Sequence, residues 1–127
     1  MSTALIQAIT AIALALAFYT AGVWEEHKDK VLKPIHLVLL WLGFCADSIG
    51  TGLMSALTAE SETVLSNLQS ITGIIAILIL MVHAMWATAI LVLHDEESYV
   101  NFRLYSMKVW RVWLVPFALS LIFGLVA

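Results

Sequence analysis

The chain has 127 residues, of which 62% are hydrophobic and 12% are charged, and its formal net charge is −3. Soluble domains are about half apolar and about a quarter charged, so this composition excludes an ordinary soluble protein. The single cysteine, Cys45, excludes a disulfide framework or a thiolate metal site within one chain. We interpret Cys45 as a small buried hydrophobic residue.

Four apolar segments follow one another along the chain, over residues 4–24, 35–57, 71–93 and 109–127. A helix of this length crosses roughly 30 Å of hydrocarbon, and a helix satisfies its own backbone hydrogen bonds in lipid. We interpret the first segment as a retained helix rather than a signal peptide, because it is longer than a usual signal core. The sequence therefore predicts one domain over residues 1–127, an all-α integral membrane four-helix bundle with up-down-up-down connectivity.

The basic residues predict how this bundle sits in a membrane. Three follow the first segment and three lie just before the fourth or in its first turn: Lys28, Lys30, Lys33, Arg103, Lys108 and Arg111. All six therefore lie on one side of the predicted bundle, which the positive-inside rule makes cytoplasmic, with both termini extracytoplasmic. Aromatic and charged residues at helical spacing over 96–106 predict an interfacial helix before the fourth segment. Trp24, Trp110 and Trp113 are typical of an interfacial aromatic belt.

Two strongly ionisable side chains lie deep within apolar segments, Asp47 in the second and His83 in the third. His36 begins the second segment and His94 ends the third, each 11 residues from the deeper group. Eleven residues place both members of a pair on one helix face, about 16 Å apart. Because the two segments run antiparallel, we expect His36 level with His94, and Asp47 level with His83 near the bilayer midplane.

The residues between these polar levels are small, with Gly43 on the second segment and Ala87 on the third. One interpretation is a polar-tipped slot between the two helices that opens toward the cytoplasm. An ionised Asp in a membrane helix costs roughly 2.5 to 3.5 kcal/mol, so Asp47 needs a partner, and His83 is the expected one. The other interpretation is close helix packing, with an interhelical hydrogen bond worth about 0.6 kcal/mol.

Two stretches carry a resemblance to a known family. "HLVLLWLGFCADSIGTGLM", residues 36–54, contains the pattern GF-x-x-D-x-x-GT, and "HAMWATAILVLH" covers residues 83–94. Together with the four-helix plan, they resemble the HsmA family of small haem-sensing and haem-sequestering bacterial membrane proteins. This resemblance implies haem b bound within the inner membrane, in a protein that sequesters or buffers haem and uses it in protection against oxidative stress.

A haem site needs one or two axial ligands, apolar walls and cations for the propionates. We expect the iron ligands among His36, His83 and His94, the first two being the strongest candidates, with Met81, Met85 and Met107 weaker. Asp47 is expected to orient an imidazole through a hydrogen bond. The remaining expected haem-site residues form the slot, line the pocket or pair with the propionates: Gly43, Ala87, Trp41, Trp86, Arg103, Lys108 and Arg111.

Helix spacing leaves the ligand arrangement open. Two imidazoles on opposite haem faces need helix axes wider apart than the roughly 8 to 10 Å of packed neighbours. The second and third helices would therefore lie diagonally or be held apart by the slot; otherwise one histidine ligates the haem, or a homodimer shares it.

Other functions fit the same sequence less well. A membrane cytochrome that transfers electrons with quinone would need histidines in the outer half, where this chain has none. A structural or regulatory subunit without a cofactor is the main rival, and a quinone is an alternative ligand for the slot. A small multidrug transporter would need a carboxylate in the first segment, which has none. We expect no nucleic-acid partner and no enzymatic activity.

Overall fold

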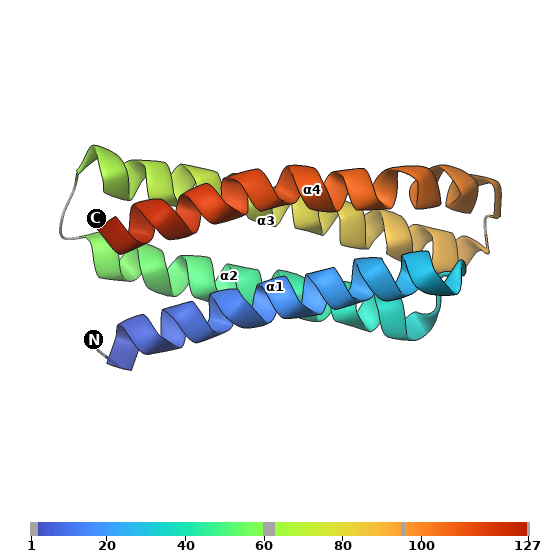
Figure 1. Cartoon of the computed structure of the whole chain (residues 1–127), viewed down its shortest axis with the longest axis horizontal. Coiled ribbons are helices and arrows are strands. Elements are labelled where there is room, and N and C mark those ends of the chain that lie inside the picture. The colour runs from blue at the N-terminus through green and yellow to red at the C-terminus, as the bar shows by residue number, and fades with distance from the viewer. Residues whose placement is uncertain (1–2, 60–62, 95, 127) are drawn as a thin grey trace.

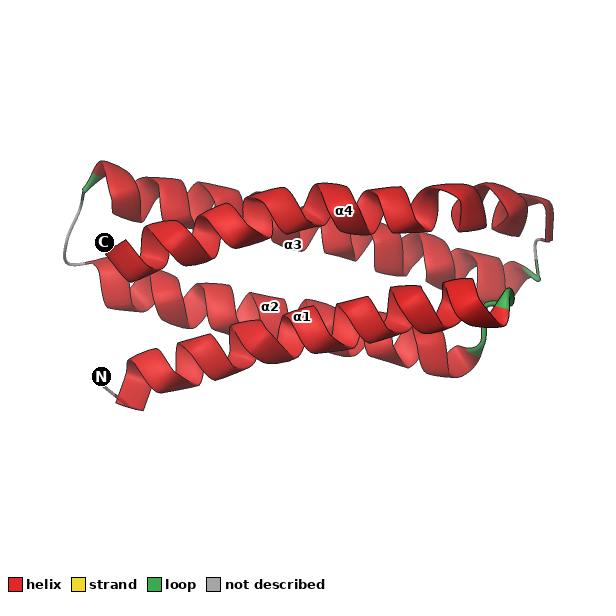
Figure 2. Cartoon of the chain, in the orientation of Figure 1, coloured by secondary structure: helices red, strands yellow, loops and turns green. Residues whose placement is uncertain are grey.

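The computed structural model describes residues 3–59, 63–94 and 96–126. These residues form four helices, α1 (Thr3–Asp29), α2 (Pro34–Thr58), α3 (Val64–Leu93) and α4 (Glu96–Val126). All four are long and apolar enough to cross a membrane, as the sequence predicts. Figure 1 shows the helices side by side, with both chain ends at one end of the bundle, and Figure 2 shows the short loop that joins α1 to α2. The expected all-α four-helix class is confirmed at this level.

The helices are arranged around a square in chain order. α1 packs mainly on α2 and α3 mainly on α4, while α2 also contacts α3 and α1 contacts α4. The second and third helices are therefore neighbours and not a diagonal pair. We call the end that carries the α1–α2 and α3–α4 connections the basic end, because Lys28, Lys30 and Lys33 lie there.

Buried positions recur every seven residues, which is the period that keeps one face of a helix against its neighbours in a bundle. On α3 one such series is Gln69, Ala76, His83 and Ile90. Apolar residues such as Val82, Val92 and Val115 lie on the outside, each at least 60% exposed. An apolar exterior around a partly polar interior suits a lipid environment.

Glycines bring α1 and α2 close together. A Cβ added to Gly43 would lie 3.1 Å from the Tyr19 nitrogen, and one added to Gly50 would lie 3.0 Å from the Ile12 nitrogen. Small residues allow such close contact between the backbones of membrane helices. Gly43 thus faces α1. The sequence analysis expected it to face α3 and form a slot there, so its observed position favours the close-packing interpretation.

Helix boundaries differ from the apolar segments for local reasons. α3 begins at Val64, earlier than residue 71, because the Ser66 N–H donates to Thr63 Oγ1 over 3.2 Å and caps the helix. Residues 96–106 do not form a separate interfacial helix, since they are the first part of the continuous helix α4. Even Pro116 lies inside α4 without ending it. Cys45 is exposed on the outside of the bundle and not buried as expected.

Candidate functional site

The polar interior follows one stripe of α4. Tyr99, Ser106, Trp113 and Ser120 are each seven residues apart, so they share one face of the helix. Each lies beside a buried polar side chain of another helix: Glu26, His83, Asp47 and Gln69, in that order. We call these eight residues the polar column.

His83 occupies the centre of the polar column and is 1% exposed. Its Nδ1 is hydrogen-bonded to the Tyr19 hydroxyl, and its Nε2 lies 2.9 Å from Ser106 Oγ. The Phe102 ring packs beside the imidazole, with centroids 5.1 Å apart. Both ring nitrogens therefore already have hydrogen-bond partners, supplied by α1 and α4.

Asp47 is also 1% exposed but has different partners. Thr51 donates to Oδ1 over 3.2 Å, and the Trp113 indole N–H donates to Oδ2 over 3.3 Å. The sequence placed Asp47 and His83 at one level, yet no hydrogen bond joins them in the described chain. Tyr19 lies between the two groups: its hydroxyl is hydrogen-bonded to His83, and its ring packs edge-on against Trp113, the partner of Asp47, with centroids 4.7 Å apart.

The fourth level of the polar column lies toward the chain termini, around Gln69, which is fully buried. Ser120 Oγ donates to the Gln69 backbone carbonyl over 2.9 Å, and the Ser55 hydroxyl donates to Gln69 Oε1 over 3.2 Å. Thr58 also donates to Gln69 Oε1, over 3.4 Å. Hydroxyl groups from α2 and α4 thus satisfy a long polar side chain of α3.

Replacing Asp47 with leucine tests the Asp47 level. Leucine has a similar branched shape but no acceptor, so the buried Trp113 indole N–H, which can only donate, loses its partner. We expect a decrease in the free energy of unfolding of about 1 to 3 kcal/mol in detergent. Thr51→Val, which removes a donor but leaves Trp113 paired, is the matched control and should cost less. Equal stability of Asp47→Leu and wild type would contradict this assignment.

His36 lies apart from the polar column, at the start of α2. The Lys33 backbone N–H donates to its Nδ1 over 3.0 Å, which leaves Nε2 protonated and donating to Asp29 Oδ2 over 3.1 Å. The ring is 1% exposed and ties the α1–α2 connection together. Both of its nitrogens, like those of His83, are used within the protein.

His94 differs from both, because it is exposed and its imidazole makes no hydrogen bond to the residues described. The backbone at His94 is left-handed, with φ of 51°, and its N–H closes the last turn of α3 on the Ile90 carbonyl. The His94 side chain lines a cavity.

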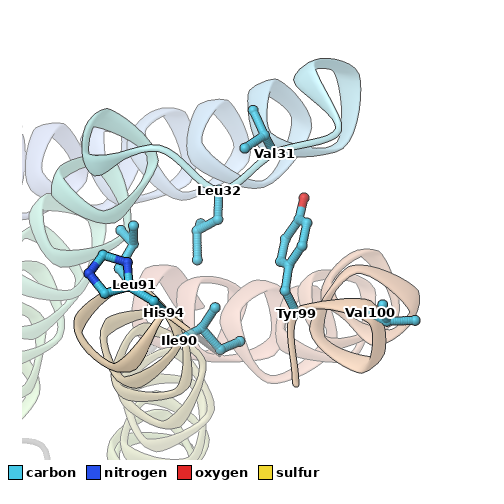
Figure 3. Close-up of a pocket in the computed structure, with 7 residues that line it drawn as sticks. All are labelled: Val31, Leu32, Ile90, Leu91, His94, Tyr99 and Val100. Carbon is cyan, nitrogen blue, oxygen red and sulfur yellow. The ribbon is translucent and has the colours of Figure 1, made fainter. Parts of the chain in front are cut away.

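The cavity at His94 lies at the basic end and has a volume of about 460 Å³. Apart from the His94 imidazole and the Tyr99 hydroxyl, the walls are apolar; seven residues line it: Val31, Leu32, Ile90, Leu91, His94, Tyr99 and Val100. Figure 3 shows His94 and Tyr99 on opposite sides of Leu32, with the Tyr99 hydroxyl directed toward the end of α1. Volumes of about 300 to 1,000 Å³ with few polar groups are typical of cofactor sites.

The positions of three of the five tryptophans differ from those expected from the sequence. Trp113 is fully buried and bonds to Asp47, so its assignment to the interfacial belt was wrong. Trp24, in contrast, is 49% exposed and packs edge-on against Trp110. Trp41 donates to Thr88 over 2.9 Å, and Trp86 packs on Phe102, so neither lines the cavity at His94.

The other predicted residues are spread along the bundle. Arg103 lines a second cavity, next to the first, and Lys108 lies 5.3 Å from the centroid of the Tyr105 ring. Arg111 is exposed, whereas Ala87 is fully buried in the core. Over residues 3–59, 63–94 and 96–126, no group of three or more His, Cys, Asp or Glu side chains is placed to hold a metal ion.

Sequence reasoning missed Glu26, which is 2% exposed, and the α4 stripe of the polar column. The signal was present as the spacing of Tyr99, Ser106, Trp113 and Ser120. It was missed because the aromatic members were read as interfacial residues and the two serines carry no charge.

These features define a four-helix protein with membrane-length helices, a polar column through its core and an apolar cavity at its basic end. No protein-family model matches the chain, and neither curated proteins nor solved structures give a match.

Proposed function

We propose that this protein binds haem b at the basic end of the bundle, in the cavity bounded by His94. The observation that carries the proposal is the His94 imidazole, which has no hydrogen bond among the residues described. It lies on the wall of a cavity of about 460 Å³ that is apolar apart from this ring and the Tyr99 hydroxyl. Haem sites combine an axial histidine with an apolar pocket.

The same observation changes the ranking of the candidate ligands. His36 and His83 would each have to give up a hydrogen bond to bind iron, whereas His94 would not. The neighbouring placement of α2 and α3 also favours ligation by one histidine of the chain over two. A second copy of the chain in a homodimer is compatible with this arrangement.

The membrane setting belongs to the proposal. With the basic end in the cytoplasm, both termini lie outside and the connectivity is up-down-up-down, in a bacterial inner membrane. Bound haem would supply one-electron iron chemistry, and the apolar residues around His94 would exclude water from it. Such a protein would sequester haem and limit oxidative damage without being an enzyme.

The test is hemin titration of the purified protein in detergent, read as a Soret band. Wild type should bind with a clear Soret shift, which His94→Ala should abolish or weaken at least about tenfold. His27→Ala is the matched control, because His27 is an exposed histidine at the same end outside this cavity. Absence of any Soret band in wild type would reject haem binding, and an unchanged spectrum in His94→Ala would reject the ligand.

The rival function is a structural or regulatory subunit without a cofactor. It is favoured by the complete pairing of His83, His36 and Asp47 within the chain, which gives these residues an architectural role. Under this alternative, hemin would leave the thermal stability of the protein unchanged, whereas a bound cofactor would raise it in proportion to its concentration.

A further inference from the structure

A second cavity, of about 360 Å³, lies between the end of α1 and the first turns of α4. His27 and Arg103 provide its basic groups, and Tyr99, Val100, Leu104 and Met107 complete its wall. Leu104 and Val100 are at least 60% exposed, so the cavity continues onto the outer surface of the bundle. Trp24 and Trp110 pack together on the same two helices, and tryptophan is typical of the membrane–water interface.

Glu26 lies behind this wall with its carboxylate unpaired. It is 2% exposed, and neither oxygen has a hydrogen-bond partner among the residues described. The Tyr99 hydroxyl is close enough to the Glu26 carboxyl group to interact with it, but the two do not meet with good hydrogen-bond geometry. Burying a polar group without a hydrogen bond costs several kcal/mol in an apolar medium. The two Glu26 carboxyl oxygens therefore favour a ligand that donates hydrogen bonds to them.

The charges around Glu26 define the kind of ligand. Arg103 acts on Glu26 electrostatically from the cavity wall. The site therefore presents a cation in its wall and, behind Tyr99, a buried carboxyl group. A zwitterion with a negative group outside and a positive, hydrogen-bond-donating group inside would complement both.

We propose that this site binds the headgroup of a phosphatidylethanolamine-type lipid. Its phosphate pairs with Arg103, assisted by His27, and its ammonium group supplies N–H donors to the two Glu26 oxygens. The Tyr99 side chain, whose hydroxyl contacts Glu26 without good hydrogen-bond geometry, turns aside to admit the ammonium. The acyl chains then lie along Leu104 and Val100 in the surrounding bilayer.

Two related lipids test the proposed headgroup contacts separately. Phosphatidylcholine has the same charges, but its quaternary ammonium carries no N–H, so it cannot satisfy the Glu26 oxygens. Phosphatidylglycerol has donors but no positive charge, and its anionic headgroup is repelled by Glu26. The site should therefore prefer phosphatidylethanolamine to both.

The experiment compares lipid retention by the full-length protein in detergent, using native mass spectrometry with each of the three lipids at equal concentration. Wild type should retain phosphatidylethanolamine about tenfold better than phosphatidylcholine, as expected for charge-assisted hydrogen bonds. Glu26→Gln should reduce this preference to near unity. Glu25→Gln is the matched control, because Glu25 is the exposed neighbour of Glu26, and it should retain the full preference.

A second variant separates the headgroup contacts from the fold. Arg103→Gln should weaken phosphatidylethanolamine and phosphatidylcholine to a similar extent, because both carry the phosphate. Equal retention of these two lipids by wild type would overturn the proposal, as would a preference that survives Glu26→Gln. Preferential retention of phosphatidylglycerol would overturn it too, by showing an anion site in place of a zwitterion site.

Discussion

Replacing Gly50 with leucine is expected to destabilise the bundle more than any other single change considered above. Even a Cβ at this position would lie 2.6 Å from Ile12 Cγ1 and 3.0 Å from the Ile12 backbone nitrogen. The backbone of α1 cannot move aside as a side chain can, so α1 and α2 must separate. Overpacking of this kind costs about 1 to 3 kcal/mol, and we expect the upper part of that range.

Gly52→Leu provides the matched control for this prediction. Gly52 lies two residues further along α2, and a Cβ there meets no atom within 4 Å. Both variants add the same side chain and remove a helical glycine. Thermal unfolding in detergent should therefore show a lower midpoint for Gly50→Leu and an unchanged or higher one for Gly52→Leu. Equal midpoints would show that the α1–α2 contact is looser than the structure indicates.

Replacing His83 with leucine is expected to lower the free energy of unfolding by about 1 to 3 kcal/mol, because it leaves the buried Tyr19 hydroxyl without a partner. Ser106 loses its partner as well, but its short side chain can bond to the backbone of its own helix. Reversible unfolding in a denaturing detergent measures the change.

Tyr19→Phe combined with His83→Leu distinguishes an unpaired hydroxyl from a simple loss of packing. Removing both members of a buried hydrogen bond is much less costly than removing one. The double variant should therefore be more stable than His83→Leu alone, by about 1 kcal/mol. If the double variant is the less stable of the two, His83 contributes mainly through its volume.

The helices could be predicted from hydropathy alone because a membrane span requires a long apolar segment. Their ends could not, since the ends depend on single hydrogen bonds. Thr63 caps α3, which begins at Val64, seven residues before the apolar segment over 71–93. After the C-terminal end of α3, residues 96–106 form the first part of α4 and not a separate helix. The sequence could not show this, because helical periodicity does not reveal where one helix stops and the next starts.

Only part of the polar interior could be predicted from the sequence. Asp47 and His83 could be predicted to be buried, because a charged side chain in a membrane helix avoids lipid. Their partners could not be predicted, because the argument compared two helices at one depth while α1 and α4 supply Tyr19, Ser106 and Trp113. A cavity at a helix end depends on connection geometry, which hydropathy does not describe; His94 was therefore ranked below His36 and His83.

The seven-residue spacing along α4 has a consequence for how the protein assembles. If α4 slid by seven residues, its apolar contacts would be nearly equivalent, since the same face would still point inward. The side chains would not be equivalent: Trp113 would take the place of Ser106 beside His83, and Ser106 would take the place of Tyr99 beside Glu26. An indole in the space of a serine overpacks the core, and a serine in the space of a phenol ring leaves a cavity. The order of different side chains along α4 thus selects one register of this helix relative to the other three. Apolar contacts alone would not specify that register.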